Sequence, residues 1–205
     1  RVVIESVRPQ VDGGRYPIKR VIGEEVLVEA DVFADGHDQV ACELLRKFEQ
    51  EKDWHGVAME FRFNDHWVAP FTVEKLGRYQ YKVRGWVDPF LTWRRDLVKR
   101  KDAGQDLAID FLIGSRFIKS EILKDEKRSA EERYQAAMSA EVPAPAAETL
   151  VASEVLEVVV DPLKARFSSW YEMFPRSVRG DGRHATFGDV AARLPYLQEM
   201  GFDVL

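Results

Sequence analysis

Apolar and polar residues alternate along several short stretches in the first part of the chain. The clearest is Val26–Phe33, where three valines and Ala30 share one face and two acidic residues occupy the other. A period of two is typical of a half-buried strand. Further strands are expected at Val2–Val7, Ala41–Glu49, Gly56–Phe63 and Gly77–Asp88. Turn-forming residues separate these stretches, so residues 1–88 predict an antiparallel β-sandwich.

Two of these expected strands carry aromatic residues in the alternating pattern. Their inward faces are expected to hold Val57, Met59, Phe61 and Phe63 in the first, and Tyr79, Tyr81 and Val83 in the second. Such side chains usually form the core between two sheets.

The period changes to helical spacing in residues 89–140. Phe90, Trp93 and Leu97 follow one another at steps of three and four. The next stretch carries two apolar stripes, formed by Leu107, Phe111, Gly114, Ile118 and Ile122 and by Ile109, Ile113 and Phe117. A helix that is apolar on so much of its circumference must be buried on more than one side. Ser129–Glu132 is a capping box, so we expect two or three helices in all.

A linker and a return strand follow the helical stretch. Residues 141–150 are rich in Pro and Ala, and Pro143 and Pro145 prevent a helix from continuing. Ser153–Asp161 is a β-branched run that predicts a strand. If this strand rejoins the sandwich, residues 1–88 and 150–166 form one domain, and residues 89–149 are a helical insertion in it.

Residues 167–205 have a third character. Trp170–Ser177 reads as a short strand, and Thr186–Asp189 resembles a capping box at the start of a helix. Pro195 lies inside the helical pattern and should kink it, and Gly201 should end it. A second strand is then expected to begin. Strand, helix and strand form the βαβ unit of a parallel sheet, which needs neighbours on both edges, so we expect more chain beyond Leu205.

Composition narrows the class of protein. The chain has 205 residues, a net charge of −5 and a pI of about 5.5, so no overall basic field favours nucleic acid. No apolar run approaches the roughly 18 residues that a membrane-spanning helix needs. The single cysteine, Cys42, fits a reducing cytoplasm.

An ordered set of motifs resembles one enzyme family, the maltose-1-phosphate-dependent α-1,4-glucan maltosyltransferases of the α-amylase clan. The stretches that carry the resemblance are Val11–Glu24, Val28–Asp38, Asn64–Trp67, Gly77–Leu97, Ala103–Leu107, Trp170–Ser177 and His184–Leu205. They run nearly from end to end, except between about Ile122 and Glu154.

The resemblance implies a layout and an activity. It implies a fibronectin- or immunoglobulin-like sandwich with a helical insertion that helps to build a homodimer, followed by the first strand, helix and start of the second strand of a (β/α)₈ barrel. The parent enzyme is expected to bind maltose 1-phosphate and to transfer maltosyl units to an α-glucan with retention, using two carboxyl groups on later barrel strands. The resemblance therefore implies no catalytic residue and no cofactor in these 205 residues.

Several residues are candidates for ligand contacts. Arg176 and Tyr171 lie at or near the expected C-terminal end of a barrel strand, where substrates bind, although both could be structural instead. A carbohydrate-binding module of another α-amylase-family hydrolase is the alternative function. It would use a stacking platform drawn from Trp54, Trp67, Trp86, Trp93, Tyr79 and Tyr81, which the core or an interface could equally hold.

The four histidines show no metal-ligand spacing, so no metal site is expected. The basic run Trp93–Asp102 is either an anion site or a solvated helix face.

Overall fold

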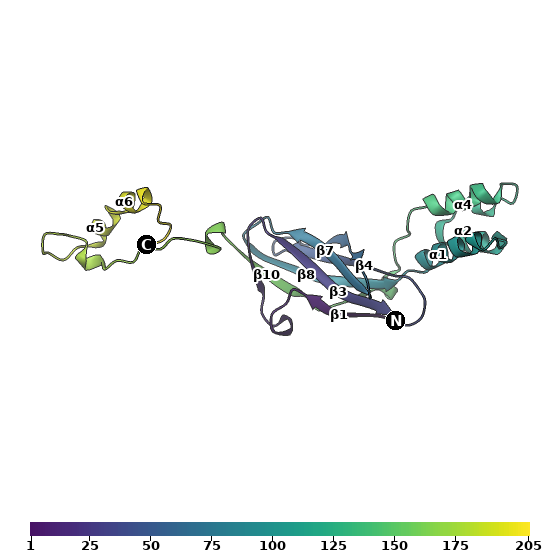
Figure 1. The fold of residues 1–205 in the computed structure, drawn as a ribbon, viewed down its shortest axis with the longest axis horizontal. Helices are drawn as coiled ribbons and strands as arrows, with labels where there is room; N and C mark the ends of the chain where they lie inside the picture. Colours follow the sequence, from purple (N-terminus) through teal and green to yellow (C-terminus); the bar gives the residue numbers. More distant parts are fainter.

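The computed structural model describes residues 1–205 and has an elongated shape with three parts (Figure 1). Two β-sheets form the middle, which we call the two-sheet body. The helical insertion, residues 89–149, lies at one end, and the C-terminal segment, residues 167–205, lies at the other. No helix is both long enough and apolar enough to cross a bilayer.

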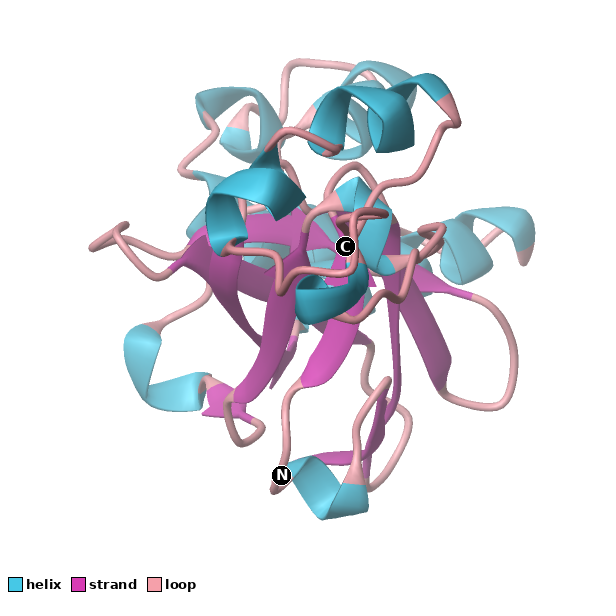
Figure 2. Ribbon diagram, turned by 90° about the vertical axis from the view of Figure 1, so that its left-hand side faces the viewer, coloured by secondary structure: helices cyan, strands magenta, loops and turns pink.

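Each sheet is assembled from strands that are distant in sequence. The first has the order β1 (Val2–Arg8), β3 (Glu25–Ala34), β7 (His66–Thr72) and β6 (Glu60–Phe61). The second has the order β2 (Ile18–Val21), β10 (Leu156–Asp161), β8 (Gly77–Val87), β4 (Val40–Phe48) and β5 (His55–Ala58), with β9 (Val151–Ala152) beside β8. Figure 2 looks along the long axis of the molecule and shows the strands of both sheets in magenta.

The prediction of a purely antiparallel arrangement is wrong at one pair. All named strand pairs are antiparallel except β2 and β10, which run parallel from Ile18 opposite Val158 to Val21 opposite Asp161. A parallel pair needs a long connection, and 134 residues separate the end of β2 from the start of β10. The prediction that the segment after the linker returns to the sheet is confirmed, because β10 pairs with β8.

A core of 19 buried residues lies between the two sheets. The inward face of β3 supplies Val26, Val28 and Val32, which are at most 1% exposed, and β8 supplies Tyr81 and Val83, which are fully buried. The hydroxyl of Tyr81 donates to the carbonyl of Pro9, so this buried polar group is satisfied. Burial raises the pKa of Tyr81 to about 12.

The stretch Gly56–Phe63 is not one strand. It forms β5 in the second sheet and β6 in the first, and the chain crosses between the sheets at Met59. Of the four apolar side chains expected on one buried face, only Met59 is buried, while Phe61 and Phe63 are 52% and 66% exposed. Alternation marked the extended backbone correctly but did not show that it passes from one sheet to the other.

The helical insertion contains four α-helices rather than two or three. They are α1 (Pro89–Asp102), α2 (Ala108–Ile118), α3 (Glu121–Lys124) and α4 (Ala130–Ser139). The continuous stripe expected through Ile122 breaks at Lys119, whose φ is 46°. Seven residues form a separate core here: Phe90, Trp93, Leu97, Leu107, Phe111, Leu123 and Ala137.

Side-chain caps fix the starts of α1 and α4. The carboxylate of Asp88 accepts the backbone N–H of Leu91 at 2.9 Å, and Pro89 occupies the first turn of α1. The predicted capping box of α4 is confirmed, since the Glu132 N–H donates to Ser129 Oγ at 3.2 Å and the Ser129 N–H donates back to Glu132 at 2.9 Å. These caps satisfy backbone groups that a helix start leaves free.

The C-terminal segment contains α5 (Phe187–Ala191) and α6 (Leu194–Glu199). The predicted strand Trp170–Ser177 is wrong. It is reduced to a parallel bridge between Trp170 and Val204 and to a 3₁₀ turn at Pro175–Ser177. The expected interruption at Pro195 is confirmed, because this residue opens α6. The remaining 3₁₀ turns are Asp12–Gly14, Ala147–Thr149 and Leu163–Ala165.

Candidate functional site

The two residues predicted to contact substrate lie in the C-terminal segment but are not brought together. The Tyr171 ring packs edge-on against Phe202 with centroids 5.1 Å apart, and its N–H donates to the carbonyl of Val204 at 2.9 Å. These contacts fasten Tyr171 to the parallel bridge. Tyr171 therefore has a visible structural role in this chain.

Arg176 occupies a different position, in the 3₁₀ turn Pro175–Ser177. It borders a hollow of about 570 Å³ that is also lined by Phe174, Pro175, Ser177, Ala185, Thr186 and Phe187. The hollow is flanked by two strongly exposed rings, Phe174 at 80% and Phe187 at 82%. Only the backbone of Arg176 is fastened, through the Ala185 N–H that donates to its carbonyl at 3.1 Å. Arg176 thus borders a hollow that two exposed aromatic rings also line.

Of the other arginines of this segment, Arg179 and Arg183 are ion-paired, and Arg193 lies over the ring of Tyr196 at 5.3 Å from its centroid. Arg179 lies 2.8 Å from Asp181 and 3.2 Å from Asp189, and Arg183 lies 2.8 Å from Asp181. The hydrogen bonds from Arg179 and Arg183 lower the pKa of Asp181 to about 2. Sequence reasoning did not single out this network, because charged residues this close in sequence are common on any surface. Its arginines neutralise carboxylates and leave Arg176 as the better candidate for an anionic ligand.

The connection between β10 and the C-terminal segment, residues 162–166, which we call the hinge, is held by Asp203. This carboxylate lies 2.9 Å from Lys164 Nζ and accepts the Ser169 N–H at 3.0 Å. The hydrogen bond from Lys164, followed by that from the Ser169 N–H, lowers the pKa of Asp203. Arg166 also reaches Glu24 of the two-sheet body at 3.4 Å. Asp203, near the C-terminal end of the segment, therefore connects Ser169, near the start of the segment, to Lys164 in the hinge.

The aromatic residues considered for a sugar platform do not share one surface. Tyr79, Tyr81 and Trp93 are at most 7% exposed, and Trp93 donates its ring N–H to the carbonyl of Asp110 at 2.8 Å. Trp54 is covered by ammonium groups, with Lys82 Nζ 4.6 Å from its ring centroid. The structure thus does not bring together the platform that the sequence offered as an alternative.

The basic run of α1 is largely engaged within the insertion. Arg100 lies 2.6 Å from the buried Asp110, and Lys101 lies 2.9 Å from Glu131. Arg94 donates to the carbonyl of Ala140. These cations hold the helices to one another, which leaves little free charge for an anionic partner.

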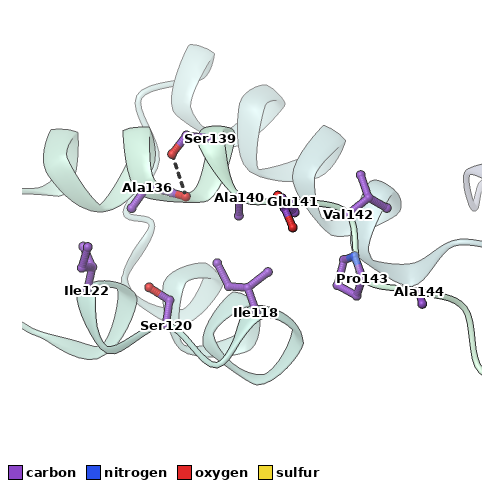
Figure 3. A pocket seen from close by; sticks show the side chains of 10 residues that line it. All are labelled: Ile118, Ser120, Ile122, Ala136, Ser139, Ala140, Glu141, Val142, Pro143 and Ala144. Carbon is purple, nitrogen blue, oxygen red and sulfur yellow. Dashed lines mark hydrogen bonds between the residues drawn. The ribbon is translucent and has the colours of Figure 1, made fainter.

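The insertion exposes a broad apolar surface. On α2, Ile109 is 71% exposed, Leu112 54% and Ile113 40%. An open groove of about 680 Å³ lies beside this helix between α3 and α4 (Figure 3). Its lower wall carries Ile118 and Ile122, and its upper wall is formed by α4 and the start of the linker. The expectation that both apolar stripes of α2 are buried is wrong for the single chain. The stripe with Phe111 and Gly114 is covered by the other helices, whereas Ile109 and Ile113 of the second stripe are exposed.

Comparison with known proteins gives the family. The family model described as domain N/S of alpha-1,4-glucan:maltose-1-phosphate maltosyltransferase matches residues 1–178. The chain belongs to this family. Proteins of that name are 41% identical in Chlorobaculum tepidum, 38% in Methylacidiphilum infernorum and 36% in Myxococcus xanthus, each over the whole of this chain. The chain spans about a third of the length of these maltosyltransferases, 34%, 34% and 35% respectively.

The family match covers most but not all of the described structure. It includes the two-sheet body, the helical insertion and the hinge, and it ends at Val178, just after the turn that holds Arg176. The match thus covers the two-sheet body and the helical insertion of Figure 1 and, in addition, residues 167–178 of the C-terminal segment.

Proposed function

We propose that this chain is the non-catalytic N-terminal region of an α-1,4-glucan:maltose-1-phosphate maltosyltransferase. The observation that carries the proposal is the match of residues 1–178 to domain N/S of that family, together with relatives of that name aligned over the whole chain. The enzyme extends α-glucans by moving maltosyl units from maltose 1-phosphate with retention. Such a reaction needs two carboxyl groups roughly 5 Å apart, which we place outside these residues. We assign the enzyme to the α-amylase clan and to the cytoplasm.

The proposal gives each part of the chain a role. The two-sheet body is a fibronectin-like sandwich, supported by its shared core and mostly antiparallel pairing. The C-terminal segment is the first strand–helix–strand unit of a (β/α)₈ barrel. The parallel bridge between Trp170 and Val204, with α5 and α6 between its two sides, supports this order. In that frame Arg176 contacts the phosphate or sugar of the substrate, whereas Tyr171, packed on Phe202, supports the strand that leads to it.

The helical insertion is proposed to form a homodimer contact together with the two-sheet body. A surface helix normally exposes polar residues, whereas α2 exposes Ile109, Leu112 and Ile113. Exposed apolar patches of this kind mark interaction surfaces. The groove between α3 and α4 (Figure 3) is lined by other residues, among them Ile118 and Ile122, so the proposed contact rests on the exposed face of α2.

Transfer and sedimentation measurements on the full-length protein test these roles separately. We expect maltosyl transfer from maltose 1-phosphate to maltooligosaccharide by the full-length protein and none by residues 1–205 alone. We also expect Ile109→Asp with Ile113→Asp to shift the full-length protein from dimer to monomer. Leu163→Asp is the matched control, because Leu163 is 63% exposed but lies in the turn Leu163–Ala165, outside both the sheets and the helical insertion.

Each outcome bears on one part of the proposal. A full-length protein without transfer activity refutes the enzyme assignment, and turnover by pure residues 1–205 refutes the non-catalytic role. A double variant that remains a dimer at micromolar concentration refutes the contact through α2.

A further inference from the structure

One exposed aromatic ring of the two-sheet body, Phe63, lies at the start of a hairpin turn whose backbone is fixed by hydrogen bonds. Phe63 is 66% exposed and precedes Asn64 and Asp65, whose φ angles are 48° and 61°. Positive φ at both central residues is what a type I′ hairpin turn requires. The His66 N–H closes the turn on the carbonyl of Phe63 at 2.9 Å, and the Asp65 carbonyl accepts the Val32 N–H at 2.8 Å. The ring is therefore presented by an anchored backbone.

Hydrogen-bonding side chains lie on the same outer face of the sheet. His66 is directly opposite Asp31 in the pairing of β3 with β7, and its Nδ1 lies 3.1 Å from the Asp31 carboxylate. Its other nitrogen is 3.8 Å from Glu29, and the His66 and Phe63 rings have centroids 6.0 Å apart. All three polar side chains remain between 29% and 39% exposed, so they keep capacity for a ligand.

Arg62 adds donors to this face. Glu60 is the first residue of β6, Arg62 directly follows this strand, and their side chains form an ion pair at 3.1 Å. The register places Glu60 opposite Val68, which shares the outer face with His66. Phe61 instead pairs with Trp67, which lies opposite Ala30 on the core-facing side. The two exposed phenylalanines of this hairpin thus belong to opposite faces.

The combination of an open ring with donors and acceptors suits a sugar. The C–H face of a pyranose packs on an aromatic ring, and its hydroxyls both donate and accept, which matches carboxylates beside a guanidinium. Three carboxylates against one guanidinium and one imidazole make the face unfavourable for phosphate or nucleic acid. The chemistry favours a neutral polyhydroxylated ligand.

We propose that this face binds glucosyl units of an α-1,4-glucan, with Phe63 as the stacking ring and Asp31, Arg62 and His66 as hydroxyl partners. We call it the Phe63 surface. The choice of α-1,4-glucan rests on the proposed function, whereas the sugar chemistry rests on the side chains themselves. None of these residues belongs to the sugar platform that the sequence suggested.

Electrophoresis of the full-length protein in native gels containing glycogen tests the Phe63 surface. Phe63→Ala is expected to raise the apparent Kd for glycogen about tenfold, which corresponds to a loss of about 1.4 kcal/mol of binding free energy. Asp31→Asn is expected to weaken it in the same direction. Phe61→Ala is the matched control, because it removes an exposed ring from the other face of the same hairpin and should change retention less than about twofold.

The outcomes separate this inference from the proposed function. Retention of Phe63→Ala equal to that of the unmodified protein overturns the inference, as does an unmodified protein that glycogen does not retard. Equal retardation by dextran, an α-1,6-glucan, overturns the assignment to α-1,4 linkages. Transfer from maltose 1-phosphate is measured in the same preparation. Transfer without a Phe63 effect refutes only the inference, whereas absent transfer refutes the proposed function. Unfolding temperatures of all variants exclude a folding defect as the cause.

Discussion

Replacing Gly114 by alanine is predicted to destabilise the protein, although Gly114 lies inside a helix, where alanine is normally favoured. A Cβ built on Gly114 would lie 2.0 Å from Cζ2 of Trp93, against the 3.4 Å at which ordinary contacts begin, so the ring must shift by roughly 1.4 Å. That ring is 7% exposed and packs against Phe90 and Phe117 with centroids 5.5 Å and 6.1 Å away. Its N–H also donates to the carbonyl of Asp110. The ring therefore has no free direction in which to move.

The change that Gly114→Ala makes in the free energy of unfolding can be estimated from two destabilising effects and one stabilising effect. Overpacking a close-packed core costs about 1–3 kcal/mol. A weakened hydrogen bond from Trp93 adds about 1 kcal/mol. Alanine regains about 1 kcal/mol over glycine in a helix interior. Gly114→Ala should thus lower the free energy of unfolding by about 2 kcal/mol, although helix propensity alone would raise it.

Urea denaturation followed by tryptophan fluorescence and circular dichroism measures this loss. Trp93→Phe removes the clashing atoms, so in the Gly114→Ala background it should cost at least about 1 kcal/mol less than in the unmodified chain. Gly188→Ala is the control, because its Cβ meets only Thr186 Oγ1 at 3.5 Å, and it should be close to neutral. Equal or greater stability of Gly114→Ala, or additive effects of the two substitutions, would refute the reasoning.

Three further predictions concern caps, protons and thiol reactivity. Ser129→Ala removes the cap of α4 and should lower the free energy of unfolding by about 1 kcal/mol, measured by urea denaturation. Lys164 and then Ser169 lower the pKa of Asp203, so the stability that this carboxylate contributes is present above the unfolded pKa of about 3.9 and is lost as pH falls through the folded value. Asp203→Asn should therefore increase proteolysis of the C-terminal segment at pH 7, and its effect should shrink as the pH falls through the folded pKa of Asp203. Cys42 is 4% exposed and burial raises the pKa of its thiol to about 12, so it should react with iodoacetamide at pH 8 only as fast as the chain opens.

Strands with one buried face were predictable because burial imposes the period directly. Val26, Val28 and Val32 alternate with polar residues, and β3 forms as expected. β7 was missed because Pro70 argues against a strand. The structure tolerates this proline because the neighbouring β6 pairs only with Val68 and Trp67, so no partner on that side needs the missing N–H.

The interruption of the helical stripe had no local signal. Lys119 takes a left-handed conformation that glycine or asparagine usually marks, while the apolar spacing continues unbroken through Ile122. Sequence therefore predicted one long helix where there are two.

The candidate site was predictable only in part, for a related reason. Arg176 was expected at the end of a strand, whereas it lies in the 3₁₀ turn that begins at Pro175, and only the pairing of Trp170 with Val204 shows that Tyr171 belongs to the bridge. Phe63 was assigned to the core because alternation cannot reveal that a strand ends at a sheet edge.

The separation of the two cores links the stability of the helical insertion to its proposed contact. The insertion has only seven buried residues of its own, and β8 and β10 pair with each other on the two sides of it. It can therefore unfold without disrupting the two-sheet body. A core of this size stabilises little by itself, so covering Ile109 and Ile113 would add a large share of the insertion's apolar burial. It follows that dissociation of the dimer should loosen the insertion well before the sheets, and hydrogen exchange of α2 should depend on protein concentration while that of β8 should not.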